Sequence, residues 1–409
     1  MLASASNERL VSALAESAAP WTDPSYSARA RVIENLSATA RLHPDMLARG
    51  LDFAFAAIGL TPLRTLLGEA EDPEALEHPI LRPTGPARRL MGPRVAFHSL
   101  AGNVPGLSLP VIAASVLARS VAIVRDSARQ PVLTEAFLET LAARDADAAA
   151  MIVPVRWESG DAAWEDDAFA LAERAELYGS DATLRDLRRR HQTVRADIIE
   201  RGTRLSLGFV PSSAPLQAAA EGFAVDITMY DGLGCLTPHA VIVSGRARAS
   251  AFASQLAAAL DVLEARWPRQ ARDFDDEAVR RAFIDACEVR CATRRDERLF
   301  RGHEDAWIVH EAGAEPPVLG PGLRCVRVIA ADRDEEALAM VAGAAAPLAG
   351  IGLAGSPAEE PYQHIASRLR GSSATLVCAP GRMQAPPLTW TQDGRRRLGD
   401  LLSWRTEAV

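Results

Sequence analysis

Lysine is absent from this 409-residue chain, so all 45 of its basic side chains are arginines. Schiff-base chemistry on lysine, a P-loop lysine and a lysine-anchored pyridoxal cofactor are therefore excluded. The 53 acidic residues outnumber the basic ones and give a formal net charge of -8. Because binding to nucleic acid needs a concentrated basic surface, we expect no nucleic-acid partner.

Long apolar runs and export signals are also missing. No stretch of about 18 uncharged apolar residues occurs, so we expect no membrane span. Met1–Pro20 has no basic residue before Arg9, and Glu8 and Glu16 interrupt its apolar stretch, which is unlike a signal peptide. The five cysteines are odd in number and widely spread, which favours a reduced, cytoplasmic protein.

Apolar segments follow the pattern of an α/β protein. The apolar fraction of 48% is ample for a folded core, and the length predicts two or three domains. Residues 1–75 have helical periodicity, with helices expected over 27–42 and from Pro44 onward. Strands and helices then alternate, which is typical of a parallel sheet. The expected strands are 94–98, 120–124, 150–155, 240–243 and 323–329, and the expected helices are 109–117 and 132–143.

Two motifs suggest ligand sites that the surrounding residues do not support. Residues 350–355 spell GxGxxG, but Pro357 and Pro361 follow, and they preclude the long helix that a dinucleotide-binding turn needs. We therefore expect an Ala/Gly-rich loop there. Cys287 and Cys291 could share one helix face, but their spacing matches no zinc pattern, so we expect small buried residues and no metal.

A glycine-rich loop around Cys235 is a candidate nucleophilic site. The residues Asp231-Gly-Leu-Gly-Cys235-Leu-Thr-Pro238 place glycines beside the cysteine, which allow a ligand to approach the backbone closely. Judged from the residues alone, Cys235 is equally well explained as a buried loop residue. His239 could assist proton transfer, although we favour a structural role for it.

Asn103 lies in a turn between an expected strand and an apolar helix. Its carboxamide could donate a hydrogen bond to an oxyanion or cap the helix, and on its own the capping role is favoured.

Taken together, these motifs resemble the acyl-CoA reductase family within the aldehyde dehydrogenase superfamily, of the bacterial luminescence fatty acyl reductase type. The resemblance rests on the turn Gly102–Gly106, the loop Asp231–Pro238 and the tail Gly381–Gly394, and extends from about residue 90 to the end. It implies an aldehyde dehydrogenase-like α/β fold with two parallel-sheet domains and oligomerisation elements. We expect the nucleotide-binding domain with the N-terminal helices over 1–203, the catalytic domain over 204–375 and a tail over 376–409.

The resemblance also assigns site residues. Cys235 matches the nucleophile that attacks the thioester, and Asn103 matches the oxyanion donor. Arg125 stands where the family's lysine contacts the adenosine ribose, with Arg129 nearby, and Gly179 and Ser180 match the turn that receives the pyrophosphate. Two arginines without a carboxylate suit a 2′-phosphate, so we favour NADPH over NADH.

One departure from the superfamily bears on the reaction. Hydrolytic aldehyde dehydrogenases carry a general-base Glu where this chain has Ser206, and without that base water is not activated to hydrolyse an acyl-enzyme. We therefore expect an acyl-CoA or carrier-protein thioester to be reduced to an aldehyde. The alternatives are a phosphate-linked semialdehyde dehydrogenase and a non-catalytic nucleotide-binding subunit.

The resemblance further suggests a homodimer or homotetramer. Trp390 and Trp404, in the tail, could form a subunit contact or pack locally, and the sequence does not separate these two roles.

Overall fold

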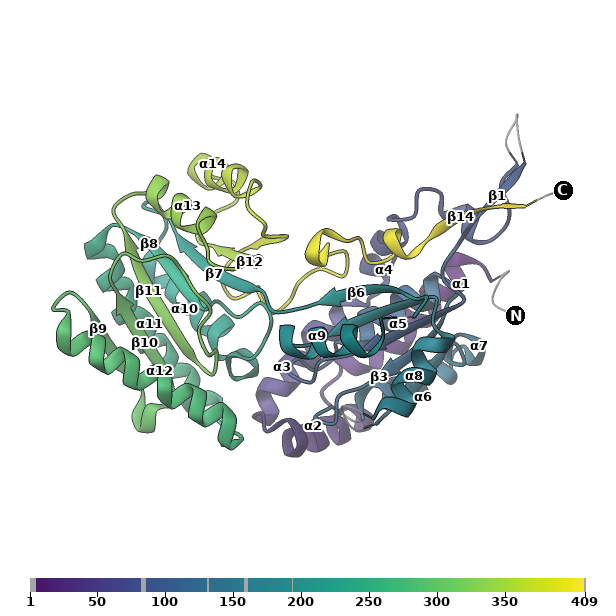
Figure 1. Cartoon of the computed structure of the whole chain (residues 1–409), viewed down its shortest axis with the longest axis horizontal. Helices are drawn as coiled ribbons and strands as arrows, with labels where there is room; N and C mark the ends of the chain where they lie inside the picture. Colours follow the sequence, from purple (N-terminus) through teal and green to yellow (C-terminus); the bar gives the residue numbers. More distant parts are fainter. Residues whose placement is uncertain (1–4, 82–85, 131, 158–160, 193, 408–409) are drawn as a thin grey trace. The chain divides into compact units, whose positions relative to one another are not determined.

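The computed structural model describes residues 5–81, 86–130, 132–157, 161–192 and 194–407. The chain forms two compact units. The first comprises residues 1–40, 47–203 and 387–409, and the second comprises residues 41–46 and 204–386. Each unit is built around one sheet (Figure 1).

The sheet of the first unit contains five parallel strands in the order β4-β3-β2-β5-β6. Its strands are β2 (Val95–Ser99), β3 (Val121–Arg125), β4 (Ile152–Val155), β5 (Arg174–Tyr178) and β6 (Asp197–Arg201). The helices between them are α5 (Ser108–Leu117), α6 (Leu133–Ala142), α7 (Ala146–Ala149), α8 (Ala162–Leu171) and α9 (Asp181–Arg190). This alternation confirms the parallel α/β architecture predicted from the sequence.

The N-terminal segment of the first unit is helical, as its periodicity predicts. Its elements are α1 (Asn7–Ala18), η2 (Ala19–Thr22), α2 (Ser27–Ala40), α3 (Pro44–Ala57), α4 (Leu60–Leu67) and η3 (Pro73–Leu76). The Ser6 hydroxyl caps α1 by accepting a hydrogen bond from the backbone N–H of Arg9 at 3.2 Å.

In the described residues, no single helix has the length and apolar character to cross a bilayer, although the bent pair α3 and α4 would pass together on length and composition.

The sheet of the second unit contains seven strands in the order β13-β12-β7-β8-β11-β10-β9, and only β9 runs antiparallel to its neighbour. Its strands are β7 (Leu205–Val210), β8 (Ala240–Ser244), β9 (Arg298–Arg301), β10 (Ile308–Ala312), β11 (Cys325–Ala331), β12 (Leu348–Leu353) and β13 (Leu376–Cys378). Its helices are α10 (Leu216–Thr228), η4 (Met229–Gly232), α11 (Arg246–Arg266), α12 (Phe274–Thr293), η5 (His303–Asp305), α13 (Asp334–Ala342) and α14 (Glu360–Leu369).

Side-chain alternation along β7 decides which residues face the core and which face the candidate site. Leu205, Leu207 and Phe209 pack in one apolar cluster with residues of α13 and α14. Ser206 and Gly208 therefore point to the opposite face, where the Phe223 ring of α10 lies so close that a Cβ on Gly208 would be 2.6 Å from it. The α10 side of the sheet also carries the loop with Cys235.

The prediction of a loop at the GxGxxG motif is wrong. Residues 348–353 form the buried strand β12, and α14 begins only at Glu360, so the glycines do not open a helix. They make room for neighbours, because a Cβ on Gly350 would lie 2.8 Å from Leu236 and one on Gly352 would lie 2.6 Å from Phe223.

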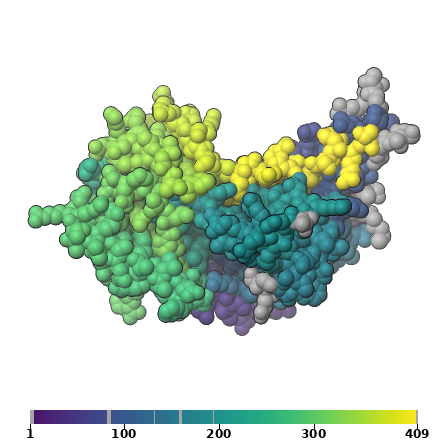
Figure 2. Space-filling view, in the orientation of Figure 1, coloured from purple at the N-terminus to yellow at the C-terminus, as the bar shows by residue number. Residues whose placement is uncertain are grey.

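The C-terminal segment returns to the first unit, where Figure 2 shows it in yellow along the surface. It contains η6 (Gln392–Gly394), η7 (Gly399–Leu401) and β14 (Ser403–Glu407), and β14 pairs antiparallel with β1 (Ala87–Met91). The Trp404 indole donates to Glu71 at 2.9 Å, and the Arg88 guanidinium lies 5.7 Å from its ring centroid. Trp404 thus makes local packing contacts, which is one of the two roles that the sequence left open for it.

Candidate active site

Three turns of the first unit lie side by side at the carboxyl edge of its sheet. They follow β3, β2 and β5, which are adjacent strands. The chain proceeds outward from β2 through β3 to β4 and then crosses to β5 and β6, so the strand order reverses between β2 and β5. Open α/β sheets bind their ligands outside the strand ends at this kind of reversal.

The turn after β2 carries Asn103. Its neighbour Gly102 packs against the turn after β3, where an added Cβ would lie 2.6 Å from the Ser127 Cβ and 3.2 Å from the Arg129 Cβ. Helix α5 begins at Ser108, its N-cap is Leu107, and no side chain caps it. Asn103 therefore does not have the helix-capping role that its residue type alone favours.

Two arginines mark the end of β3. The Arg125 guanidinium donates to the Trp157 carbonyl at 3.1 Å and to the Ser99 hydroxyl at 3.4 Å, and it lies 5.6 Å from the Trp157 ring centroid. Burial lowers its pKa, so this cation is held in a partly desolvated position. Arg129 is exposed in the next turn. Asp126, which the sequence analysis did not single out, is buried beside them, and desolvation raises its pKa to about 6.

Gly179 and Ser180 form the turn between β5 and α9. The Gly179 N–H donates to the Arg201 carbonyl at 3.3 Å, and the Ser180 hydroxyl caps α9 by accepting from the Thr183 N–H at 3.2 Å. Asn103, Arg125, Arg129, Gly179 and Ser180 are thus all on this edge of the first unit. The unpaired N–H groups at a helix start favour an anion there, although Asp181 in the first turn also carries a carboxylate.

Cys235 lies in the second unit, between η4 and β8. Of the five cysteines it is the exposed one, so the alternative of a buried Cys235 is wrong. Burial raises the pKa of Cys287 to about 11 and those of Cys325 and Cys378 to about 12, which disfavours their thiolates.

The loop before Cys235 is fastened at Asp231. Tyr230, Asp231 and Gly232 all have positive φ angles, of 55°, 53° and 72°. The Asp231 carboxylate accepts from the Nε of buried Arg324 at 2.9 Å. A Cβ on Gly232 would lie 2.7 Å from the Arg324 backbone nitrogen, so the glycine permits this close approach.

The tail motif fastens the same loop from its other side. The Asp226 carboxylate accepts from the N–H groups of Gly381 at 2.6 Å and Met383 at 3.0 Å. This turn brings the Gln384 amide to the Thr237 hydroxyl at 3.1 Å, and a Cβ on Gly234 would lie 2.3 Å from Gln384 Oε1. The residues quoted for the family resemblance therefore pack on the cysteine loop.

The side chain of Ser206 contacts the backbone of Cys235. Its hydroxyl donates to the Cys235 carbonyl at 3.1 Å, and its own carbonyl accepts from the His239 N–H at 2.9 Å. His239 Nδ1 accepts from the Gly320 N–H at 3.2 Å, and burial lowers the His239 pKa to about 4. These contacts agree with a structural role for His239.

Cys287 and Cys291 lie on α12, with Cys287 in an apolar cluster that includes Phe283 and Ile308. Across the described residues, no group of three or more His, Cys, Asp or Glu side chains is arranged to hold a metal ion.

The family model of the acyl-CoA reductase LuxC matches residues 2–404. The chain belongs to the LuxC acyl-CoA reductase family. Two curated relatives are "Long-chain acyl-protein thioester reductase 2" of Photobacterium leiognathi and "Long-chain acyl-protein thioester reductase" of Vibrio harveyi. Each is 25% identical, over 54% and 57% of this chain and 45% and 48% of the relative. The chain spans about half the length of the curated relatives it matches.

Solved structures show the fold. A NAD-dependent benzaldehyde dehydrogenase from Corynebacterium glutamicum has a TM-score of 0.74 at 12% identity, covering 98% of this chain and 84% of that one. The glyceraldehyde-3-phosphate dehydrogenase GapN from Methanocaldococcus jannaschii, complexed with NADP, has a TM-score of 0.72 at 9% identity, covering 99% and 90%. This LuxC-family protein therefore has the aldehyde dehydrogenase-like α/β fold expected from its motifs.

Proposed function

We propose that this protein reduces an acyl thioester to an aldehyde with NADPH, through an acyl-enzyme on Cys235. The observation that carries the proposal is an exposed Cys235 on a loop fastened by Asp231, Ser206 and Gln384. A nucleophile held by its backbone attacks from a defined position, which lowers the entropic part of the barrier. Membership of the LuxC family and the names of the relatives support the substrate class, a long-chain acyl group on CoA or on a carrier protein.

In this mechanism the Cys235 thiolate forms a bond to the thioester carbonyl carbon, and the carbon–sulfur bond to the carrier breaks, releasing the carrier thiol. The Cys235 N–H donates to the carbonyl oxygen, which bears negative charge as the tetrahedral species forms. The resemblance to the family assigns the same donor role to Asn103. After reduction, the thiohemiacetal on Cys235 collapses to release the aldehyde and restore the thiol. Ser206 cannot accept a proton from water as a carboxylate would, so hydrolysis to the acid is not assisted.

The residues of the first unit fit a bound dinucleotide. The cofactor NADPH, when bound, supplies the hydride for the reduction. Arg125 and Arg129 at the end of β3 would hold a 2′-phosphate, and Gly179 and Ser180 at the start of α9 would receive the pyrophosphate. The position of these groups at the strand reversal supports the assignment.

The test follows NADPH absorbance with acyl-CoAs of increasing chain length and with an acyl-carrier protein. We expect oxidation of NADPH with aldehyde release, and we expect Cys235→Ala to abolish it while the Kd for NADPH stays within twofold. Cys291→Ala, at a half-buried cysteine of α12, is the matched control and should retain turnover. Turnover that persists in Cys235→Ala would contradict the proposal. Dependence on an acyl phosphate would indicate the semialdehyde dehydrogenase alternative, and NADPH binding without turnover would indicate the non-catalytic one.

We also propose a homodimer or homotetramer, for which the outer edge of β14, in the two-stranded ribbon with β1, could extend a neighbouring sheet. Sedimentation of the full chain would distinguish these states from a monomer.

A further inference from the structure

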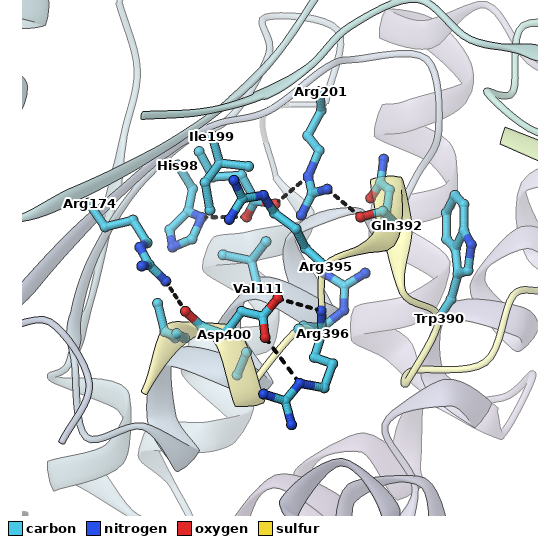
Figure 3. Close-up of a pocket in the computed structure, with 14 residues that line it drawn as sticks. His98, Val111, Arg174, Ile199, Arg201, Trp390, Gln392, Arg395, Arg396 and Asp400 are labelled. Carbon is cyan, nitrogen blue, oxygen red and sulfur yellow. Dashed lines mark hydrogen bonds and ion pairs between the residues drawn. The ribbon is translucent and has the colours of Figure 1, made fainter. Parts of the chain in front are cut away.

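A cavity in the first unit lies between one face of the five-stranded sheet and the C-terminal segment (Figure 3). Its volume is about 30 Å³. Since a water molecule needs about 10–15 Å³ by this measure, the cavity admits a ligand of a few heavy atoms and no nucleotide. Its charged and titratable side chains come from strands and tail together: His98, Arg174, Glu176, Arg201, Arg395, Arg396, Arg397 and Asp400.

One ring nitrogen of the buried His98 side chain lacks a partner in this cavity. Only 5% of the residue is exposed, and it lies opposite Glu176 in the register of β2 and β5. The two side chains meet at 3.2 Å between His98 Nδ1 and Glu176 Oε2. Within the described part of the chain, His98 Nε2 has no hydrogen-bond partner. A buried polar atom of this kind costs free energy unless something occupies the position beside it.

Glu176 fixes which His98 nitrogen is left for a ligand. Burial alone would raise the Glu176 pKa, but the hydrogen bond from His98 and the charges of His98, Arg201 and Arg397 outweigh it and keep that pKa below its usual range. The ionised carboxylate accepts hydrogen bonds from Arg201 Nε at 2.8 Å and from His98 Nδ1–H at 3.2 Å. Nε2 then donates to an anion when the ring is protonated and accepts from a hydroxyl-bearing oxyanion when it is neutral.

The charges around the cavity favour an anion. Five arginines line it, against the carboxylates of Glu176 and Asp400. Asp400 is already occupied, since its carboxylate accepts from Arg396 Nε at 3.0 Å and its carbonyl accepts from Arg174. Arg395 is exposed and forms no ion pair with any carboxylate among the described residues. Three of the five arginines already pair with carboxylates: Arg174 with Asp197, Arg201 with Glu176 and Asp393, and Arg396 with Asp400. The guanidinium groups of Arg395 and Arg397 are the cations beyond these pairs, and guanidinium groups bind oxyanions such as phosphate or carboxylate through paired N–H donors.

The cavity is separate from the proposed nucleotide site. Successive side chains of a strand point to opposite faces of its sheet. His98 therefore faces the side of β2 opposite to Ser99, and Ser99 is paired in register with Arg125. The cation assigned to the cofactor and the cavity thus lie on different faces of the same sheet.

We propose that this cavity is a binding site for a small oxyanion, held between His98 on the sheet and the arginine cluster 395–397 of the tail. Such a ligand bridges the sheet to the tail and stabilises the returned C-terminal segment. The proposal concerns ligand binding alone and does not depend on the thioester reductase activity.

The first test titrates inorganic phosphate into the full chain at constant ionic strength, with sodium chloride as the balancing salt, and records the melting temperature. We expect a saturable rise in the wild type. Arg395→Gln, on the surface, should weaken the apparent Kd at least fivefold, and His98→Leu at least tenfold. Arg246→Gln, an exposed arginine of the second unit, is the matched control and should stay within twofold of the wild type.

The outcomes separate the sources of the ligand. If a phosphate monoester binds as tightly as inorganic phosphate, the proposed site takes a phosphate group that belongs to a larger molecule. If only the inorganic ion binds, the ligand of the site is a free anion. An Arg395→Gln Kd within twofold of the wild type, an unsaturable response, or an equal response to added chloride would overturn the proposal. If His98→Leu fails to fold, the apparent Kd of Arg395→Gln for phosphate still tests the proposal.

A crystal grown with selenate gives an independent answer. We expect an anomalous selenium peak within hydrogen-bond distance of His98 Nε2. Only water at that position, under conditions where the melting temperature has stopped rising, would overturn the assignment.

Discussion

The ion pair between Asp231 and Arg324 is the strongest anchor of the cysteine loop, and replacing Asp231 by Asn tests it. Both side chains are 1% exposed, and Asp231 Oδ1 lies 2.6 Å from Arg324 Nη2. Removing one partner of a buried pair costs about 3–5 kcal/mol, because the other charge stays buried without compensation. Arg324 keeps Glu264 and the Trp267 carbonyl as partners, and the Asn oxygen can still accept. We therefore expect a cost below this range, about 2–3 kcal/mol off the free energy of unfolding.

An exposed pair in the same unit supplies the control. Arg246 and Asp332 lie 3.1 Å apart, and each side chain is 68% exposed. Asp332→Asn should cost about 0–1 kcal/mol, because solvent screens exposed pairs. Urea unfolding of both variants and the wild type gives the comparison, and the rate at which a thiol reagent labels Cys235 in the native protein reports on the loop itself. We expect a changed labelling rate in Asp231→Asn only. Equal unfolding midpoints and equal labelling rates in the two variants would refute the anchoring role.

Three further predictions address the loop, its pH dependence and the cofactor. Ser206→Ala removes the bond to the Cys235 carbonyl, so kcat/KM should fall by about tenfold, equivalent to about 1.4 kcal/mol, with the Kd for NADPH unchanged; an unaltered kcat/KM would contradict this. Burial raises the Asp226 pKa to about 7, so its contribution to stability is present below about pH 4 and is lost as pH rises through 7. Unfolding midpoints at pH 5 and pH 8 should therefore differ more in the wild type than in Asp226→Asn, and equal differences would count against it. Arg129→Gln should raise KM for NADPH about tenfold and leave KM for NADH within twofold, as steady-state kinetics would reveal; a parallel rise in both would exclude a 2′-phosphate contact.

The fold could be predicted wherever local pattern determines local structure. The alternation of apolar segments over 94–155 located β2, α5, β3, α6 and β4, because a parallel sheet needs a crossover between its strands. The strand β12 was missed because it is buried on both faces and therefore shows no alternation. Glycine is also a residue type that is depleted in strands, so Gly350 and Gly352 argued against one. Only the tertiary neighbours of these two glycines explain why they occur in this strand.

The candidate site was predictable as separate motifs, and its connections were not. The residues alone left two interpretations open for Cys235 and favoured a capping role for Asn103, and the resemblance to a known family supplied their roles and that of Gly179. The contacts that fasten the loop join residues far apart in the chain, such as Asp226 with Gly381, and no periodicity signals them. Asp226 is one of several polar residues of helix α10, which also carries Gln217, Glu221 and Thr228, and the sequence alone does not distinguish it from a solvent-exposed side chain.

The central claim is that Cys235 carries the acyl group between thioester and aldehyde. Intact-protein mass spectrometry after incubation with a long-chain acyl-CoA, without NADPH, tests it most directly. The account predicts a mass increase equal to the acyl group less one hydrogen, mapped by peptide analysis to Cys235 and discharged on addition of NADPH with release of aldehyde. An adduct that maps to another cysteine, or one that forms equally in Cys235→Ala, would contradict it.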